Sequence, residues 1–207
     1  IQFANQGIPV QGIDISEEML RIAMSRSTAA TAAATAGATA LCFEQGDARS
    51  YRAGRKFDAV LSLFHVVSYQ TANQDLADTF ETARVHLDPG GRFMFDFWYG
   101  PAVLSDRPRI VERVVASDDV EVNRRTTPTM RVNDNCVDVH FDITVTSKSS
   151  RESVSFAEDH HMRYLFLPEL RHMLGRAGFS NIEFRRWLSS EEPSDTGWYA
   201  CCIAEAI

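Results

Sequence analysis

Two carboxylates in this chain follow short apolar segments, a position from which they could bind a nucleoside. Asp14 ends the segment 10–14, which contains β-branched residues, and Asp47 follows the segment 40–44. A carboxylate at the carboxyl end of a parallel strand lies in the ligand crevice of an open α/β sheet and can accept both hydrogen bonds of a ribose diol. Asp14 therefore predicts a nucleoside-containing cofactor. The alternative that stays open is that Asp14, like Ser16, only caps the helix that follows.

A third strand end leads from the apolar segment 57–64 into His65. Such a nearly continuous apolar run is typical of a strand buried on both faces, so we expect a central strand. Residues that follow parallel strands open onto one crevice and should converge there. His65 is the candidate proton acceptor, because an ordinary imidazole has a pKa of ~6.5, and Tyr69 is the candidate that orients a nucleophile. A plain polar residue at a strand end, for His65, and core packing, for Tyr69, are the open alternatives.

Aromatic and basic side chains elsewhere are candidates for contacting a substrate. Trp98 and Tyr99 follow the apolar strand predicted at 92–97, where they could contact a substrate or form a hydrophobic plug. His160 and Arg163 are the other candidates for a substrate pocket. We expect no metal site, because the neighbouring His160 and His161 point to opposite faces of a strand.

The elements that must position these residues alternate between strands and helices. A helix is expected from Glu17 into the alanine-rich tract, ending near Gly37, and a second one over 76–87. Strands alternating with helices at such intervals predict right-handed crossovers and a parallel, doubly wound α/β sheet.

The second half of the chain has a different pattern. Residues 108–165 contain strand-like segments separated by short polar turns, and residues 137–145 alternate strictly between apolar and polar, which predicts an antiparallel β insertion with one solvated face. We expect the insertion 108–165 to be a substrate-binding region. A helix over 168–177 follows. Segments 181–187 and 198–203 are joined by a loop too short for a crossover helix, so we expect a terminal antiparallel strand pair.

Composition narrows the class of protein. With 207 residues the chain can build one domain with an insertion, and its net charge of -7 argues against a nucleic-acid surface. No segment has the length and hydropathy of a membrane span. The four cysteines lack metal-ligand spacing, which favours a reduced, cytoplasmic protein acting on a small molecule. A homodimer is a candidate assembly for this protein.

Several short motifs, taken in order, resemble those of the class I S-adenosylmethionine-dependent methyltransferases. The resemblance implies a Rossmann-like sheet over nearly the whole chain and S-adenosylmethionine as the cofactor. The motifs are Val10-Gln11-Gly12-Ile13-Asp14-Ile15-Ser16, Gly46-Asp47-Ala48-Arg49, Phe57-Asp58-Ala59-Val60, Leu87-Asp88-Pro89-Gly90-Gly91 and Ala177-Gly178-Phe179.

The same resemblance implies roles for individual residues. Asp14 would hold the ribose hydroxyls and Asp47 would accept a hydrogen bond from the adenine amino group. The other implied cofactor contacts are Ile15 and Met19 beside adenine, Gly46 and Ala48 in the loop that carries Asp47, and Leu63 and Phe64 beside the methionine part. Segments 63–69 and 158–164 are similar to those of enzymes that methylate amino groups of nucleotide-linked sugars, and methyl transfer to N or to O both remain open.

One feature of the family is missing, because no strand followed by a glycine-rich loop precedes the segment that ends at Gly7. That strand would lie in the middle of the sheet, and its loss would leave unpaired backbone groups, so we expect the sequence to be incomplete at its N-terminus. Two other functions stay open: a nicotinamide-dependent oxidoreductase, whose ribose is also held by an acidic residue, and a non-catalytic binding module with a methyltransferase-like fold.

Overall fold

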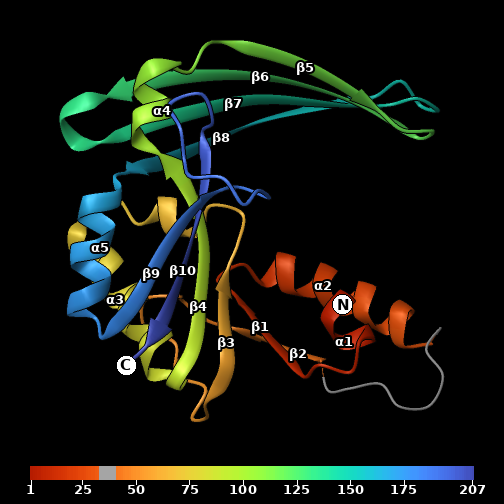
Figure 1. Cartoon of the computed structure of the whole chain (residues 1–207). Helices are drawn as coiled ribbons and strands as arrows, with labels where there is room; N and C mark the ends of the chain where they lie inside the picture. Colours follow the sequence, from red (N-terminus) through yellow and green to blue (C-terminus); the bar gives the residue numbers. More distant parts are fainter. Residues whose placement is uncertain (33–40) are drawn as a thin grey trace. The chain divides into compact units, whose positions relative to one another are not determined.

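The computed structural model describes residues 1–32 and 41–207, which fall into two compact units, Ile1–Gly54 (unit 1) and Arg55–Ile207 (unit 2). Figure 1 labels the helices and strands of both units. Each unit is described by itself. The helix end predicted near Gly37 lies outside the described residues.

Unit 1 contains a short parallel sheet and two helices. Apolar and β-branched residues form strand β1, and Gly7, with φ 83°, breaks the chain before it in the left-handed region that glycine tolerates. Leu20, on the inner face of the second helix, is 6% exposed. The elements are α1 (Gln2–Asn5), β1 (Val10–Asp14), α2 (Glu17–Ala32) and β2 (Leu41–Gln45), and β1 pairs with β2 in parallel.

Unit 2 contains one large mixed sheet with helices against it (Figure 1). Along this sheet the strands of the described residues follow the order β5-β6-β7-β8-β4-β10-β9, and β3 pairs with β4 at the side. Strands β9 and β10 pair antiparallel, so the predicted terminal strand pair is confirmed. The core elements are β3 (Phe57–Ser62), η1 (Val66–Tyr69), α3 (Asn73–Val85), β4 (Leu87–Tyr99), α4 (Gly100–Ser105), α5 (Leu167–Arg176), β9 (Phe179–Arg186) and β10 (Tyr199–Ala206).

Strand β4 divides its side chains between two faces of the sheet. Phe93, Phe95 and Phe97 point to one face and are at most 1% exposed, packed with residues of α3 and α5 such as Phe80 and Leu170. Because side chains alternate along a strand, Met94, Asp96 and Trp98 point to the other face. The aromatic core therefore fixes which residues of β4 are available for chemistry.

The predicted antiparallel insertion is confirmed. Its strands are β5 (Val111–Ala116), β6 (Val120–Arg131), β7 (Cys136–Ser147) and β8 (Ser153–Leu165), with the short 3-10 helix η2 (Val132–Asp134) between β6 and β7. Each strand pairs antiparallel with the next. The end of β8 also pairs in parallel with β4, through Trp98↔Tyr164 and Tyr99↔Leu165, so the insertion continues the main sheet.

Two expectations for individual strands were wrong. Segment 57–64 is not a central strand buried on both faces: β3 ends at Ser62, pairs with β4 alone among the described residues, and leaves Leu61 43% exposed. Strand β4 starts at Leu87 rather than at 92, because Phe57 pairs with Leu87. The sheet of unit 2 is mostly antiparallel, since the insertion and the terminal pair supply most of its strands. Parallel pairing in the described chain is limited to β1–β2, β3–β4 and β4–β8.

Candidate functional site

In unit 1 the two predicted carboxylates follow neighbouring strand ends. Asp14 pairs with Gln45 across the β1–β2 ladder, and the backbone N–H of Gly46 donates to the Asp14 carbonyl over 3.0 Å. Asp47 comes directly after Gly46, so both carboxylates lie at the carboxyl ends of the two paired strands. Asp14 and Asp47 are therefore neighbours, as expected, and their convergence with the third strand end at His65 stays a prediction.

Asp14 has a structural contact and also a free acceptor. Its Oδ1 accepts the Ser16 backbone N–H over 2.9 Å, and Ser16 Oγ in turn accepts the Met19 N–H over 3.3 Å. Asp14 therefore has the helix-capping contact that the alternative expects. Within residues 1–32 and 41–207, however, Asp14 Oδ2 has no hydrogen-bond partner, which leaves lone pairs for a ligand. Near it in the chain, Ile15 is 67% and Met19 54% exposed, so both side chains are open to a ligand.

Asp47 is held by an arginine that the sequence analysis gave no role. The Arg49 guanidinium donates through Nε to Oδ1 over 3.0 Å and through Nη2 to Oδ2 over 2.6 Å. This hydrogen bonding lowers the pKa of the Asp47 carboxyl below its ordinary value. Ala48 lies in the turn that Asp47 begins, since the Asp47 carbonyl accepts the Ser50 N–H over 3.0 Å. An ionised Asp47 with remaining lone pairs can still accept from an amino group.

Gly46 is required by an aromatic ring in its own unit. A Cβ at this position would lie 2.6 Å from Cδ2 of Tyr51, a separation that carbon atoms do not tolerate. The Tyr51 hydroxyl donates to Glu44 over 2.6 Å and accepts from the Gln11 side chain, and burial with the Glu44 contact raises the pKa of Tyr51 to about 12. Gly46 and Tyr51 together therefore fix the loop that carries Asp47.

In unit 2 the residues after β3 form a strained turn. Phe64 and His65 both have φ 64°, which is uncommon for residues other than glycine, and Phe64 is 86% exposed. Leu63 precedes them outside the strand. The His65 backbone N–H donates to Asp96 Oδ1 over 3.1 Å, and His65 Nδ1 lies 2.6 Å from Asp96 Oδ2. These two atoms lie within ion-pair distance, but their geometry is not that of a hydrogen bond, so His65 Nδ1 has no hydrogen-bond partner among the described residues.

Two further aromatic rings surround His65. The Tyr199 ring stacks on the imidazole with centroids 4.7 Å apart and planes 14° apart, and Trp98 lies at 6.4 Å in a tilted arrangement. This placement follows from register, since Tyr199 pairs with Trp98 across β10 and β4. Trp98 thus faces His65, whereas Tyr99 packs against the main apolar core. The alternative of a hydrophobic plug under the insertion describes Trp98, which also packs against Val137, Val139 and Met162.

Tyr69 and His160 come together although 91 residues separate them. The Tyr69 hydroxyl lies 2.6 Å from His160 Nδ1, and the edge of the His160 ring contacts Phe141 at a centroid distance of 5.0 Å. Burial, followed by the nearby Glu158 carboxylate, raises the pKa of Tyr69 above its ordinary value. Tyr69 is therefore a neutral hydrogen-bonding group at physiological pH.

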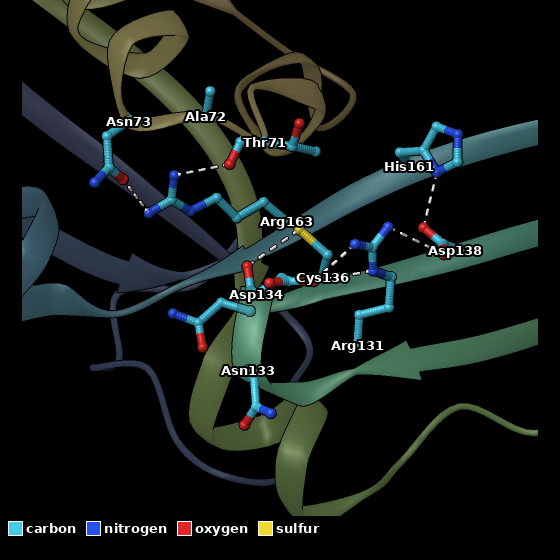
Figure 2. A pocket seen from close by; sticks show the side chains of 11 residues that line it. Thr71, Ala72, Asn73, Arg131, Asn133, Asp134, Cys136, Asp138, His161 and Arg163 are labelled. Carbon is cyan, nitrogen blue, oxygen red and sulfur yellow. Dashed lines mark hydrogen bonds and ion pairs between the residues drawn. The ribbon is translucent and has the colours of Figure 1, made fainter.

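Arg163 lies on the other face of β8, together with His161. Its guanidinium donates to the Thr71 carbonyl over 3.1 Å, to Asn73 Oδ1 over 2.7 Å, and to Glu169. Figure 2 shows the contacts with Thr71 and Asn73 at the wall of a polar pocket of about 610 Å³, where His161 pairs with Asp138. The Arg163 guanidinium is thus hydrogen-bonded to protein groups, and Arg163 and His160 lie on opposite faces of β8. Its role in substrate binding stays a prediction.

The polar face of the insertion yields a prediction about pH. His140 contacts Asp159 at 2.7 Å, and this hydrogen bond, with a smaller contribution from Asp142, raises the pKa of His140 above its ordinary value. A raised folded-state pKa stabilises the fold below about pH 6.5, and the contribution disappears as the pH rises through the folded-state pKa. His140→Gln should therefore lower the thermal midpoint at about pH 6 and leave it unchanged at about pH 9.

Thermal unfolding at both pH values measures this, with His172→Gln, an exposed histidine on α5, as the control. An equal loss at both pH values would contradict the assignment.

The described residues contain neither a candidate metal site nor a membrane-spanning helix. Among the residues that the structure describes, no group of three or more His, Cys, Asp and Glu side chains could hold a metal ion. His160 and His161 face opposite sides of β8, as the sequence predicted. Across the described helices, none combines the length and apolar character needed to span a bilayer.

Sequence reasoning missed the partners of several candidates. Asp96 was visible as an acid inside an apolar strand, which is a signal for a buried ion pair. Arg49 stands two residues from Asp47 and could have been paired with it locally. Tyr199 and Tyr51 gave no such signal, because their contacts depend on strand register and on loop packing.

Comparison with known proteins identifies the chain's relatives. Residues 1–91 match a family model described as a methyltransferase domain. The dTDP-3-amino-3,4,6-trideoxy-alpha-D-glucopyranose N,N-dimethyltransferase of Streptomyces venezuelae is 31% identical over 140 residues, which cover 68% of this chain and 54% of that protein. The match thus spans about half of the relative's length.

Solved structures share the fold. An S-adenosylmethionine-dependent methyltransferase from Clostridium acetobutylicum has a TM-score of 0.80 at 18% identity, with 99% of this chain and 77% of that chain covered. The amino pentose methyltransferase CalS10 from Micromonospora echinaspora, solved with S-adenosylmethionine bound, has a TM-score of 0.69 at 18% identity, covering 96% of this chain and 74% of that one. Residues 1–91 thus match a methyltransferase domain, and the chain shares the fold of S-adenosylmethionine-dependent methyltransferases, the class that its motifs resemble.

Proposed function

We propose that this protein transfers a methyl group from S-adenosylmethionine to the amino group of a nucleotide-linked sugar. The observation that carries the proposal is Asp14, which follows β1 with a free carboxylate oxygen beside the exposed Ile15 and Met19. A carboxylate acceptor next to apolar side chains suits a ribose diol joined to adenine. The amino-sugar acceptor is supported by the printed activity of the Streptomyces venezuelae relative.

The residues of unit 1 fit the cofactor chemically. Asp14 would accept both ribose hydroxyls, Ile15 and Met19 would contact the adenine faces, and Asp47 would accept from the adenine amino group while Arg49 keeps it ionised. Gly46 and Ala48 would set the position of Asp47. S-adenosylmethionine supplies a methyl carbon bound to a positively charged sulfur.

The residues of unit 2 would serve the acceptor. Methyl transfer is an in-line displacement, so alignment of the attacking nitrogen is the main requirement. His65 would accept the proton that the amine loses, and the neutral Tyr69 hydroxyl, in contact with His160, would orient the amine. Leu63, Phe64 and Trp98 would exclude water around the reacting atoms.

Other expectations remain predictions beside this proposal. They are a cytoplasmic location, a homodimer, the absence of nucleic-acid binding, and a single domain in which 108–165 contributes to the substrate site.

Calorimetric titration of the full-length protein with S-adenosylhomocysteine and with NADH tests the class. We expect saturable binding of S-adenosylhomocysteine and none of NADH. Transfer of a labelled methyl group to a panel of nucleotide-linked sugars, with and without an amino group, then tests the acceptor. Binding of NADH alone would support the oxidoreductase, and binding of neither would support a non-catalytic module.

A further inference from the structure

The backbone at His65 adopts a conformation that needs support from elsewhere in the fold. Phe64 and His65 both have φ 64°, and neither is a glycine. Such a conformation is strained for a residue with a Cβ and persists where the surroundings hold it. Here the Asp96 carboxylate accepts the His65 N–H, at 3.1 Å from Oδ1 and 3.2 Å from Oδ2. Asp96 therefore holds the turn that presents His65.

The same carboxylate also faces the imidazole. Asp96 is 1% exposed, on the face of β4 opposite the phenylalanine core, and His65 Nδ1 lies 2.6 Å from its Oδ2. A buried carboxylate is costly unless protein groups compensate its charge. Within the part of the chain that the structure describes, the polar groups in contact with this carboxylate both belong to His65.

We propose that Asp96 is a positioning residue that keeps His65 in the tautomer with a proton on Nδ1 and a free lone pair on Nε2. An Nδ1 lone pair would be repelled by the carboxylate, whereas an Nδ1–H group is attracted to it. The stacked Tyr199 ring, at 4.7 Å, restricts rotation of the imidazole. His65 then offers Nε2, the nitrogen on the far side of the ring from Asp96.

In this tautomer Nε2 is the His65 nitrogen that can accept a proton, and its use in catalysis rests on the proposed methyl transfer. The acceptor nitrogen forms its bond to the methyl carbon as the bond from that carbon to sulfur breaks, and the electron pair stays on sulfur. The nitrogen then carries a positive charge and loses one proton, which His65 Nε2 accepts. The imidazolium formed has its positive charge next to the Asp96 carboxylate, which stabilises it.

Nitrogen-15 NMR of histidine-labelled, full-length protein tests the tautomer without any activity. We expect the neutral His65 signal, assigned by its loss in His65→Gln, to show a protonated Nδ1 and an unprotonated Nε2. In Asp96→Asn, the amide NH2 can donate to Nδ1, so the tautomer should shift toward Nε2–H. Asp88→Asn, an exposed acid on the same strand, is the matched control and should leave the signal unchanged.

Kinetics supply the second measurement. Asp96→Asn should lower kcat about 10-fold and leave the KM for the methyl donor unchanged, because the variant alters proton transfer and not donor binding. An Nε2–H tautomer in the wild-type protein would overturn the proposal, even if the variant did not fold. If the protein transfers methyl groups but Asp96→Asn leaves the His65 tautomer unchanged, the positioning proposal is overturned and the proposed function is not. Absence of any methyl transfer by the wild-type protein would count against the proposed function instead.

Discussion

Replacing Asp14 by alanine is expected to weaken binding of S-adenosylhomocysteine about 100-fold, because the side chain would lose two charge-assisted hydrogen bonds to the ribose, together worth about 3 kcal/mol. Calorimetric titration of the full-length protein measures this loss. Glu18→Ala is the matched control, since it removes a carboxylate from the first turn of α2 whose partner is Arg21. Its affinity should equal that of the wild type.

A second substitution separates the ribose contact from helix capping. Asp14→Asn retains an amide oxygen that can accept the Ser16 N–H, so we expect thermal stability close to that of the wild type. It lacks the negative charge and one of the two acceptor oxygens, so affinity should still fall at least about 10-fold. Wild-type affinity in both variants would show that Asp14 only caps the helix.

His65→Gln should lower kcat about 100-fold, the lower range for loss of a general base. The Kd for S-adenosylhomocysteine should stay unchanged, because His65 is assigned to the acceptor and not to the adenosine. Rapid-mixing or steady-state assays with a labelled methyl donor provide kcat, and titration provides the Kd. His172→Gln, the exposed histidine of α5, is the control. A loss of less than about threefold in kcat would remove His65 from proton transfer.

Local signals made much of the cofactor side predictable. The β-branched residues before Asp14, the Ser16 cap and the acidic first turn of α2 are all neighbours in sequence, and the structure confirms the strand and helix that they indicate. The alternation over β7 likewise predicted the insertion, because one face of that sheet is solvated. Predictions of this kind depend on a few adjacent residues.

Features that depend on distant pairing were harder to predict. An apolar composition made β3 resemble a central strand, but its burial depends on which strands flank it, and β4 is its one partner in the described chain. The contact between His65 and Asp96 spans 31 residues and requires a left-handed backbone at two residues that do not usually adopt it. Neither property can be deduced from local preferences.

The joining of β8 to β4 limits how acceptor selectivity can be redesigned. Because Tyr164 and Leu165 pair with Trp98 and Tyr99, a one-residue slip in a grafted insertion would turn the buried side chains of Tyr164 and Leu165 to the opposite faces of the sheet. Chimaeras between relatives should therefore exchange 108–163 and keep both pairs intact. Insertions spliced with altered spacing at this seam would be expected to lose turnover while retaining affinity for the methyl donor.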